Sequence, residues 1–392
     1  MQKLQSTKLF TFLVTTLLSF NLLAQEALPV SSLNNIIKPI ATLQPDSSFD
    51  DIKFLQETFK EKDLIALGEV THGTKEVYMY KDRLIRYLVS SLEYKAIAFE
   101  SDYSSLEDID NYINGEIDTV SMSTNYKPLF SWLRNFNKGK DRYDKVHVYG
   151  LEIREFSGAI DKILATTKQI SAVDKEVLLR VKALPFTQIP NTSLKGLKEV
   201  CSRLPKTLYS KMLMQLIENY PNFIRSGKVG FRDKAMAEIA IAIKESTANK
   251  KLIIWAHNGH VAKTALYGKP TMGEYLVKHY NDKYYVIATD INKGNVSVRK
   301  YLAKNKPVSN WQSVYYPEVN SNKAYEYYFK QCKFKNFILE VKQTIIDRDL
   351  KAFLTQEKEM RMIGALSVPV NKKLSIANNF DMVVYFDETN SI

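Results

Sequence analysis

The sequence predicts an α/β fold with a mainly parallel central sheet flanked by helices. Its short apolar runs are nearly continuous rather than alternating, as in strands buried on both faces, and stretches with apolar residues at helical spacing lie between most of them. Strands that alternate with helices favour parallel pairing. The expected strands are 64–68, 96–99, 146–151, 252–256, 284–288, 337–341 and 382–386, and the expected helices include 75–90, 231–246 and 271–280.

Residues 1–24 have the pattern of a secretory signal peptide. Lys3 and Lys8 precede an apolar run over residues 9–23, and Ala24 supplies a small residue at the cleavage point. We therefore expect the mature protein to be exported by a bacterial cell, to the periplasm or to the medium. No later apolar run approaches the length of a membrane span, so no stable membrane anchor is expected after the signal is removed.

The α/β core is expected in two parts, residues 25–155 and 235–392. Between them, residues 156–234 contain no convincing strand, and their apolar residues recur at helical spacing. We expect this helical insertion either to cap a site or to add helices behind the sheet. Residues 303–330 are polar and rich in aromatic side chains, with Pro307 and Pro317, and are expected to be irregular.

Composition and charge exclude several classes of protein. The 392 residues are 45% hydrophobic, which excludes a disordered chain and permits a large core. The net charge of +12 comes from Lys and Arg residues spread along the whole chain, so we expect no nucleic-acid partner. Cys201 and Cys332 are the two cysteines. They could pair in an oxidising compartment or remain free as buried thiols.

Four predicted strands run into ionisable or amide side chains at their carboxyl ends. These side chains are Glu69 with His72, Glu100, Glu152, and His257 with Asn258 and His260. Ligands of open α/β sheets bind at the carboxyl ends of the strands, so we expect these groups to gather at one edge. Each alone could cap a helix or face solvent. Their convergence, which uses three of only five histidines, favours a functional site.

These side chains suit hydrolysis by an activated water molecule. A His residue can take a proton from water near neutral pH, and a neighbouring Glu can orient its ring. A second His or an amide can donate to the oxyanion that forms. Glu and His are also zinc ligands, which leaves a metal-dependent enzyme as an alternative. We find no Gly-x-Ser-x-Gly elbow, no Cys in a recognisable pattern with a His and no glycine-rich phosphate loop, and we expect no cofactor.

Two motifs, in this order and at this separation, carry a resemblance to a known family. They are Gly68-Glu69-Val70-Thr71-His72-Gly73 and His257-Asn258-Gly259-His260. Shorter matches lie at 98–100, 149–152, 232–237, 272–273 and 380–381. On these residues the sequence resembles the erythromycin esterase family over about residues 45–390.

The resemblance implies a hydrolase (an esterase) that opens the lactone ring of macrolide antibiotics such as erythromycin and confers macrolide resistance. It implies that His72 is the general base on water, with Glu69 and Glu100 as the paired acids and His257 and His260 as the second histidine motif. The related reading is a hydrolase of the same family that acts on another ester, lactone or amide, with or without a metal. A non-catalytic binding protein is a third reading.

The resemblance also suggests residues that contact the substrate. An Arg commonly stands nine residues after the base, where this chain has Lys81, with Arg83 two positions further on. Lys can serve as a point charge but lacks the bidentate fork of Arg. Glu152 stands where the family usually has Asp. The expected substrate-binding residues are Lys81, Arg83, Glu152 and Asn258.

An acidic stretch follows the second predicted strand. It contains Glu100, Asp102, Glu107, Asp108, Asp110, Glu116 and Asp118 and no Lys or Arg. Acids beside a cleft would attract the cationic amino sugar of a macrolide. The alternative is that they lie at a helix N-terminus and on a solvated face.

Overall fold

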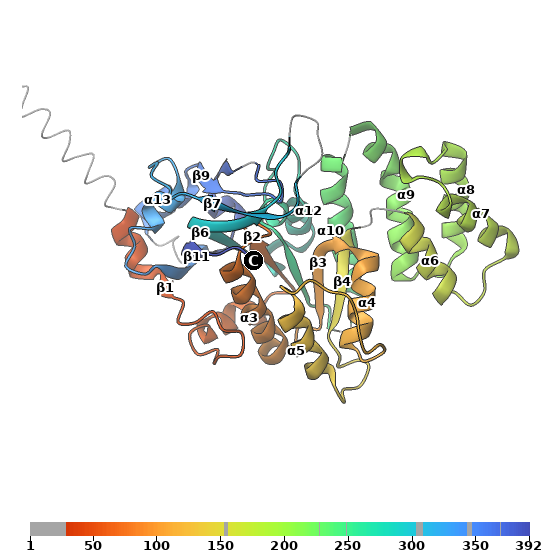
Figure 1. The fold of residues 1–392 in the computed structure, drawn as a ribbon, viewed down its shortest axis with the longest axis horizontal. Helices are drawn as coiled ribbons and strands as arrows, with labels where there is room; N and C mark the ends of the chain where they lie inside the picture. Colours follow the sequence, from red (N-terminus) through yellow and green to blue (C-terminus); the bar gives the residue numbers. More distant parts are fainter. Residues whose placement is uncertain are drawn as a thin grey trace, which may run out of the picture.

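A computed structural model describes residues 29–392, apart from 153–155, 227, 248, 303–308, 343–346 and 369. The predicted signal peptide lies outside the described residues. A nine-stranded sheet runs through the centre of the molecule (Figure 1), with the strand order β1-β8-β11-β6-β2-β5-β3-β4 and β7 paired to β6. The strands are β1 (Lys38–Pro39), β2 (Leu64–Glu69), β3 (Ala96–Asp102), β4 (His147–Glu152), β5 (Leu252–His257), β6 (Tyr284–Val298), β7 (Gln312–Tyr316), β8 (Asn336–Glu340) and β11 (Met382–Thr389).

The sheet is mainly parallel, as the sequence predicts. Every pairing from β11 through β6, β2, β5 and β3 to β4 is parallel. The antiparallel pairs are β1 with β8, β8 with β11, and β7 with β6. The α/β prediction is therefore confirmed, with antiparallel additions that the apolar runs alone do not reveal.

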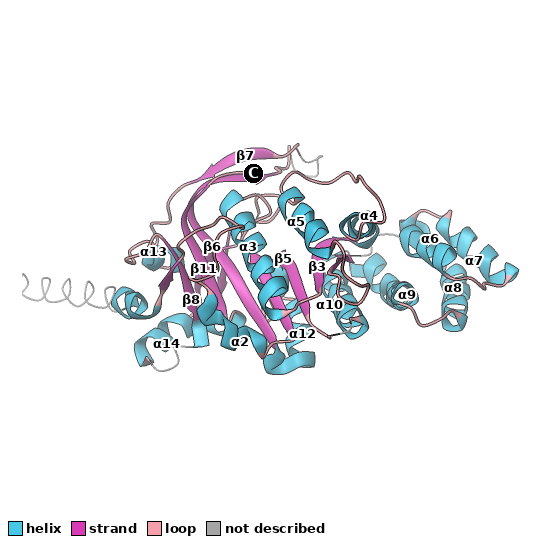
Figure 2. Cartoon of the chain, turned by 90° about the horizontal axis from the view of Figure 1, so that it is seen from below, coloured by secondary structure: helices cyan, strands magenta, loops and turns pink. Residues whose placement is uncertain are grey.

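Helices cover both faces of the sheet (Figure 2), and each face has its own apolar core. On one face, Ile65 and Ile253 pack with residues of α3 (Lys75–Leu92), α4 (Tyr103–Ile113) and α5 (Lys127–Asn137). The core on the other face contains the strand residues that alternate with these, because their side chains point to the opposite side of the sheet. They pack with α10 (Lys228–Ser246) and α12 (Met272–Tyr280). Burial on both faces explains why the strands are continuously apolar.

The segment after β4 forms helices with a separate core. They are α6 (Phe156–Thr166), α7 (Ala172–Lys182), α8 (Asn191–Arg203) and α9 (Leu208–Ser226). Figure 1 shows them at one end of the molecule, beyond α4 and β4. Their apolar faces pack on one another, and the buried cluster contains no residue of the sheet.

The prediction of an irregular segment over 303–330 is wrong for part of that range. It contains β7 and a short helix, α13 (Tyr325–Phe329). β6 extends well beyond the predicted 284–288, and its second half supplies the hydrogen-bonding edge for β7. Because β7 is mostly exposed, it lacks the apolar pattern that marks a buried strand. A second small sheet pairs β9 (Lys358–Arg361) with β10 (Asn371–Leu374).

The two cysteines are both free and buried. Cys201 lies in the core of the helical segment, whereas Cys332 lies in a core of the sheet, so they do not form a disulfide. None of the helices within the described part of the chain is long and apolar enough to cross a membrane.

The long strand β6 clamps the loop that follows β2. The Ser297 backbone N–H donates to the carbonyl oxygen of Gly73 at 2.9 Å. A Cβ atom on Gly73 would lie only 1.9 Å from the carbonyl oxygen of Ser297. The missing side chain therefore allows two backbones to meet directly beside His72.

Replacing Gly73 by Ala is expected to lower the free energy of unfolding by about 1–3 kcal/mol, because the added carbon would push β6 away. The control is Gly196→Ala in α8, where the nearest atom would be 3.7 Å away. A mid-helix Gly-to-Ala change should raise stability by up to about 1 kcal/mol. Urea unfolding measures both. A Gly73→Ala protein as stable as the unmodified one would contradict this account.

Candidate active site

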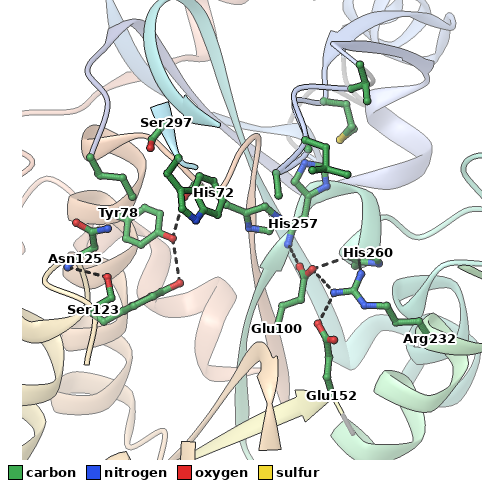
Figure 3. A pocket seen from close by; sticks show the side chains of 18 of the residues that line it. His72, Tyr78, Glu100, Ser123, Asn125, Glu152, Arg232, His257, His260 and Ser297 are labelled. Atoms are coloured by element: carbon green, nitrogen blue, oxygen red, sulfur yellow. Dashed lines mark hydrogen bonds and ion pairs between the residues drawn. The ribbon is translucent and has the colours of Figure 1, made fainter. Parts of the chain in front are cut away.

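The carboxyl ends of the parallel strands surround a cavity of about 750 Å³, within the size range of small-molecule sites. Of the predicted site residues, His72, Glu100, Glu152, His257 and His260 line it (Figure 3). The sheet register explains this convergence. The last residues of β2 and β5 are direct neighbours, and so are those of β3 and β4.

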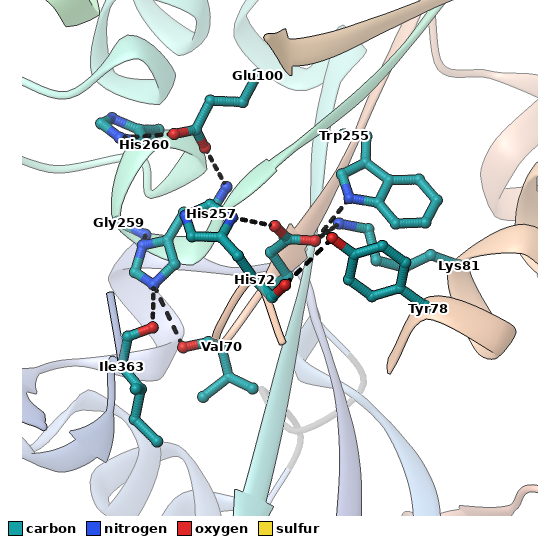
Figure 4. Close-up of polar contacts among 12 residues, drawn as sticks. Val70, His72, Tyr78, Lys81, Glu100, Trp255, His257, Gly259, His260 and Ile363 are labelled. Atoms are coloured by element: carbon teal, nitrogen blue, oxygen red, sulfur yellow. Dashed lines mark hydrogen bonds and ion pairs between the residues drawn. The ribbon is translucent and has the colours of Figure 1, made fainter. Parts of the chain in front are cut away.

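A buried carboxylate, Glu69, anchors one side of the site (Figure 4). It contacts Nδ1 of His72 at 2.6 Å and accepts from Nζ of Lys81 at 2.9 Å and from Nε1 of Trp255 at 2.6 Å. Burial alone would raise the pKa of Glu69, but the charge of Lys81 and the contacts with His72 outweigh it and lower the pKa to about 2. Glu69 is therefore ionised at any working pH.

The ionised Glu69 sets the proton position on His72. The carboxylate accepts from Nδ1–H, so Nε2 carries the lone pair. Among the described residues, Nε2 has no hydrogen-bond partner, and the side chain lines the cavity with 25% of its surface exposed. Burial disfavours the charged ring, but the hydrogen bond and charge of Glu69 outweigh it and raise the pKa of His72. His72 is thus a fixed, strengthened base.

His257 is a neutral neighbour of this base. Its Nδ1 accepts from the Gly259 N–H at 3.1 Å, so Nε2–H donates to the carbonyl oxygens of Val70 and Ile363, both at 3.3 Å. Burial, followed by the nearby His72, lowers the pKa of His257 to about 4. Both ring nitrogens are therefore engaged, and the ring packs 5.4 Å from that of His72.

Arg232 connects the groups on the other side of the cavity (Figure 3). It donates from Nη2 to Glu100 at 2.6 Å and to Glu152, and from Nη1 to Nε2 of His260 at 2.6 Å. Nδ1 of His260 faces Asp233 at 2.8 Å. Burial would raise the pKa of Glu100, but its positive surroundings, Arg232 among them, and the backbone N–H of His257 outweigh burial and hold that pKa well below its usual value. The result is a charged cluster with a fixed geometry.

Sequence reasoning did not select Arg232 and Asp233 as site residues. They lie near the start of α10 rather than at a strand end, so the strand-end argument does not find them. The available signal was the match to the family at residues 232–237, which begins with this Arg–Asp pair. Asp233 also accepts from the Met272 N–H at 2.9 Å, which ties α10 to α12.

Three of the expected substrate-binding residues do not line the cavity. Arg83 is fully buried and paired with Asp51, so its assignment as a substrate ligand is wrong. Asn258 is also fully buried, and its amide donates to the carbonyl oxygen of Thr289 at 2.7 Å, which makes it a support for the sheet edge.

The third residue, Lys81, is 1% exposed and contacts Glu69, with its ammonium 4.1 Å from the centre of the Trp255 ring. Burial lowers the pKa of Lys81 to about 8, despite the opposing charge of Glu69. Lys81 therefore supports the base through Glu69 instead of reaching the cavity.

The acidic stretch after β3 does not form an acidic wall of the cavity. Glu107 pairs with Lys162, Asp118 pairs with Arg134, and Asp110 contacts His147. Of the seven acids, Glu100 alone is among the lining residues described. The first turn of α4 contains no acid, whereas Asp108, Glu116 and Asp118 are exposed, so a solvated face describes this stretch better than a helix N-terminus does.

The helical segment does not cap the cavity. Among the described side chains of residues 156–234, Arg232 is the single one that lines it. Loops form the rim instead, and their exposed apolar residues include Tyr267, Trp311 and Val368.

Within the described part of the chain, no group of three His, Cys, Asp or Glu side chains is arranged to hold a metal ion.

Comparisons with known proteins point to one family. The model of the erythromycin esterase family matches residues 89–389. The chain is 25% identical over 312 residues to the putative hydrolase YbfO of Bacillus subtilis, covering 62% of this chain and 68% of that protein. It is 23% identical over 284 residues to erythromycin esterase type II of Escherichia coli, covering 58% and 67%.

Solved structures share the fold. A succinoglycan biosynthesis protein superposes with a TM-score of 0.80 at 19% identity, covering 93% of this chain and 98% of that one. An erythromycin esterase mutant, EreC in its open conformation, superposes with a TM-score of 0.64 at 14% identity, covering 90% and 97%. At these identities the likeness shows the fold alone.

Removing the Glu69–Lys81 pair is expected to lower the pKa of His72. In a Glu69→Gln, Lys81→Met protein, the ring loses the carboxylate that stabilises its protonated form, and neither partner is left as an unpaired buried charge. Titration of the His72 ring by NMR measures the change. Asp110→Asn, beside His147, is the control and should leave His72 unaffected. An unchanged pKa of His72 in the double variant would contradict the role of Glu69.

Proposed function

We propose that this chain, a hydrolase that belongs to the erythromycin esterase family, opens the lactone ring of macrolide antibiotics such as erythromycin. The observation that carries the proposal is the His72–Glu69 pair at the wall of a cavity large enough for a bulky ester. Such a reaction would confer macrolide resistance. We also propose that residues 1–24 direct the protein out of the cytoplasm, to the periplasm or the medium.

The proposed reaction uses water as the nucleophile. Nε2 of His72 removes a proton from a water molecule, whose oxygen forms a bond to the carbonyl carbon while the π electrons move to the carbonyl oxygen. The tetrahedral intermediate then collapses, the ring C–O bond breaks, and His72 returns the proton to the departing alkoxide. Glu69, with a pKa of about 2, remains ionised and stabilises the imidazolium through both steps.

Arg232 is our candidate for stabilising the negative charge on the intermediate. The sequence left this role to a second His or an amide. Both ring nitrogens of His257 are engaged, however, and Nε2 of His260 accepts from Arg232. The guanidinium side chain is 29% exposed at the cavity wall. Among the described residues, acceptors occupy three of its five N–H groups, and we assign the other two to a substrate oxygen.

A second candidate is hydrolysis of a different ester, lactone or amide, with or without a metal. Two observations favour keeping it. The named erythromycin esterases are only 21–23% identical to this chain, and a relative at 25% identity is described only as a putative hydrolase. In addition, Lys81 stands where the family commonly has Arg, and Lys lacks the bidentate fork of Arg.

Incubation of erythromycin with the purified protein lacking residues 1–24 is expected to yield a product heavier by one water molecule, detected by mass spectrometry. His72→Ala should abolish the product while circular dichroism shows an unchanged fold, because only the proton acceptor is removed. His279→Ala, on the exposed surface of α12, should keep full activity. Unchanged erythromycin, with other esters hydrolysed, would favour the second candidate.

Arg232→Lys is expected to lower kcat on the active ester by about 10²-fold, because Lys keeps one charge but loses the planar fork that reaches Glu100, Glu152 and the substrate together. KM should change less than kcat. Arg134→Lys, which affects an Arg outside the cavity, is the matched control. Steady-state kinetics measure both, and an unchanged kcat in Arg232→Lys would remove Arg232 from the mechanism.

A further inference from the structure

A second, smaller cavity adjoins the first beside His72. It measures about 260 Å³, and His72, Glu100, Ser123 and Tyr126 line both cavities. His72 therefore lies where the large cavity meets the smaller one, which we call the inner chamber. Figure 3 shows Tyr78, Ser123 and Asn125 on the opposite side of His72 from Arg232 and Glu152.

Apolar side chains and four serines share the wall of the inner chamber. The apolar members are Phe99, Leu106, Ile109, Met122, Phe130 and Trp255, and the serines are Ser101, Ser105, Ser121 and Ser123. The aromatic members pack in a fixed arrangement, since Phe99 lies 5.7 Å from both Trp255 and Tyr126, and Tyr126 lies 5.8 Å from Phe130, between ring centres. The shape of the chamber is thus built into the core beneath α4 and α5.

Tyr126 lines both chambers, and hydrogen bonds and ring contacts hold it in place. Its hydroxyl lies 3.1 Å from that of Tyr78, which in turn donates to the carbonyl oxygen of His72 at 3.3 Å. The two acids that reach the inner chamber are already satisfied, Glu69 by three donors and Glu100 by Arg232 and the backbone of His257. An apolar group in this chamber therefore meets no unpaired charge.

We propose that the inner chamber is the subsite for the smaller, apolar side of the substrate ester, and that Met122 sets its depth. The proposal rests on ester hydrolysis at His72. An open-chain ester has one substituent on each side of the carbonyl, whereas in a lactone the smaller side is a short alkyl branch that the ring carries next to the ester bond. Apolar cavities of roughly 150 Å³ hold a benzene molecule, so this chamber takes a phenyl ring or a short alkyl chain. The larger side of the ester occupies the main cavity.

Met122 is the residue best suited to test this subsite. It lies on the loop between α4 and α5, is partly buried and packs against the core of that face. A loop Met is flexible and tolerates replacement, so its size can be changed in both directions. Met214, partly buried in α9 and packed in the helical core, offers the same substitution far from the cavity.

The test measures kcat/KM for two series of esters. In the first, 4-nitrophenyl is fixed and the acyl group grows from acetyl through butyryl to octanoyl. In the second, octanoyl is fixed and the alcohol grows from methyl through butyl to octyl. In at least one series, kcat/KM should fall about tenfold or more from the four-carbon to the eight-carbon group, because the longer chain exceeds the inner chamber.

Met122 variants should move this limit. Met122→Ala should reduce the fall in kcat/KM between the four-carbon and the eight-carbon group. Met122→Trp should make kcat/KM fall already at the four-carbon group. Met214→Trp should leave every ratio of kcat/KM between chain lengths unchanged. Chain-length ratios that stay the same in both Met122 variants, in both series, would overturn the proposal.

A binding measurement separates this proposal from the proposed function. If no ester is hydrolysed, the esterase proposal fails, but the subsite is still tested by calorimetric titration with N-methylbenzamide. Its affinity should fall at least about tenfold in Met122→Trp and persist in Met214→Trp. No binding to the unmodified protein, or equal binding to Met122→Trp, would overturn the subsite and leave a chamber that holds only water.

Discussion

The site depends on one buried carboxylate and the three donors that surround it. Glu69 ends β2, and its donors come from the loop after that strand, from α3 and from β5, so a single ionised group joins three parts of the fold. An unpaired carboxylate could not remain charged at this depth. Because its partners keep it charged, the ring of His72 has a fixed tautomer and a raised pKa. The contacts of Glu69 therefore both join three parts of the fold and raise the proton affinity of His72.

A second charged centre lies across the cavity and is separated from the first by a neutral ring. Arg232 neutralises Glu100 and Glu152, whereas Lys81 neutralises Glu69. Between them, the low pKa of His257 keeps that side chain uncharged, so the two ionic groups do not share protons through it. This division places a proton acceptor on one side of the cavity and a positive charge on the other.

Most of the site-forming elements could be predicted from the sequence, because buried parallel strands are visible as apolar runs and their ends share one edge. Glu100, His257 and His260 follow from that rule. Arg232 does not, because it comes from a helix start whose position against the sheet depends on tertiary packing. Arg83 was selected by its nearness to Lys81 in sequence, but two residues along a helix point in different directions. The strand β7 was missed because its partner, rather than its own pattern, defines it.

The helices α6–α9 bury a core of their own, and this has a consequence for how the protein opens. Proteins open locally in cooperative units whose free energies of opening differ, and such units often coincide with supersecondary motifs. The sheet holds the base between β2, α3 and β5, while Arg232 lies where the helical segment gives way to α10. A local opening of the helical unit therefore leaves the proton acceptor ordered and affects the site through Arg232.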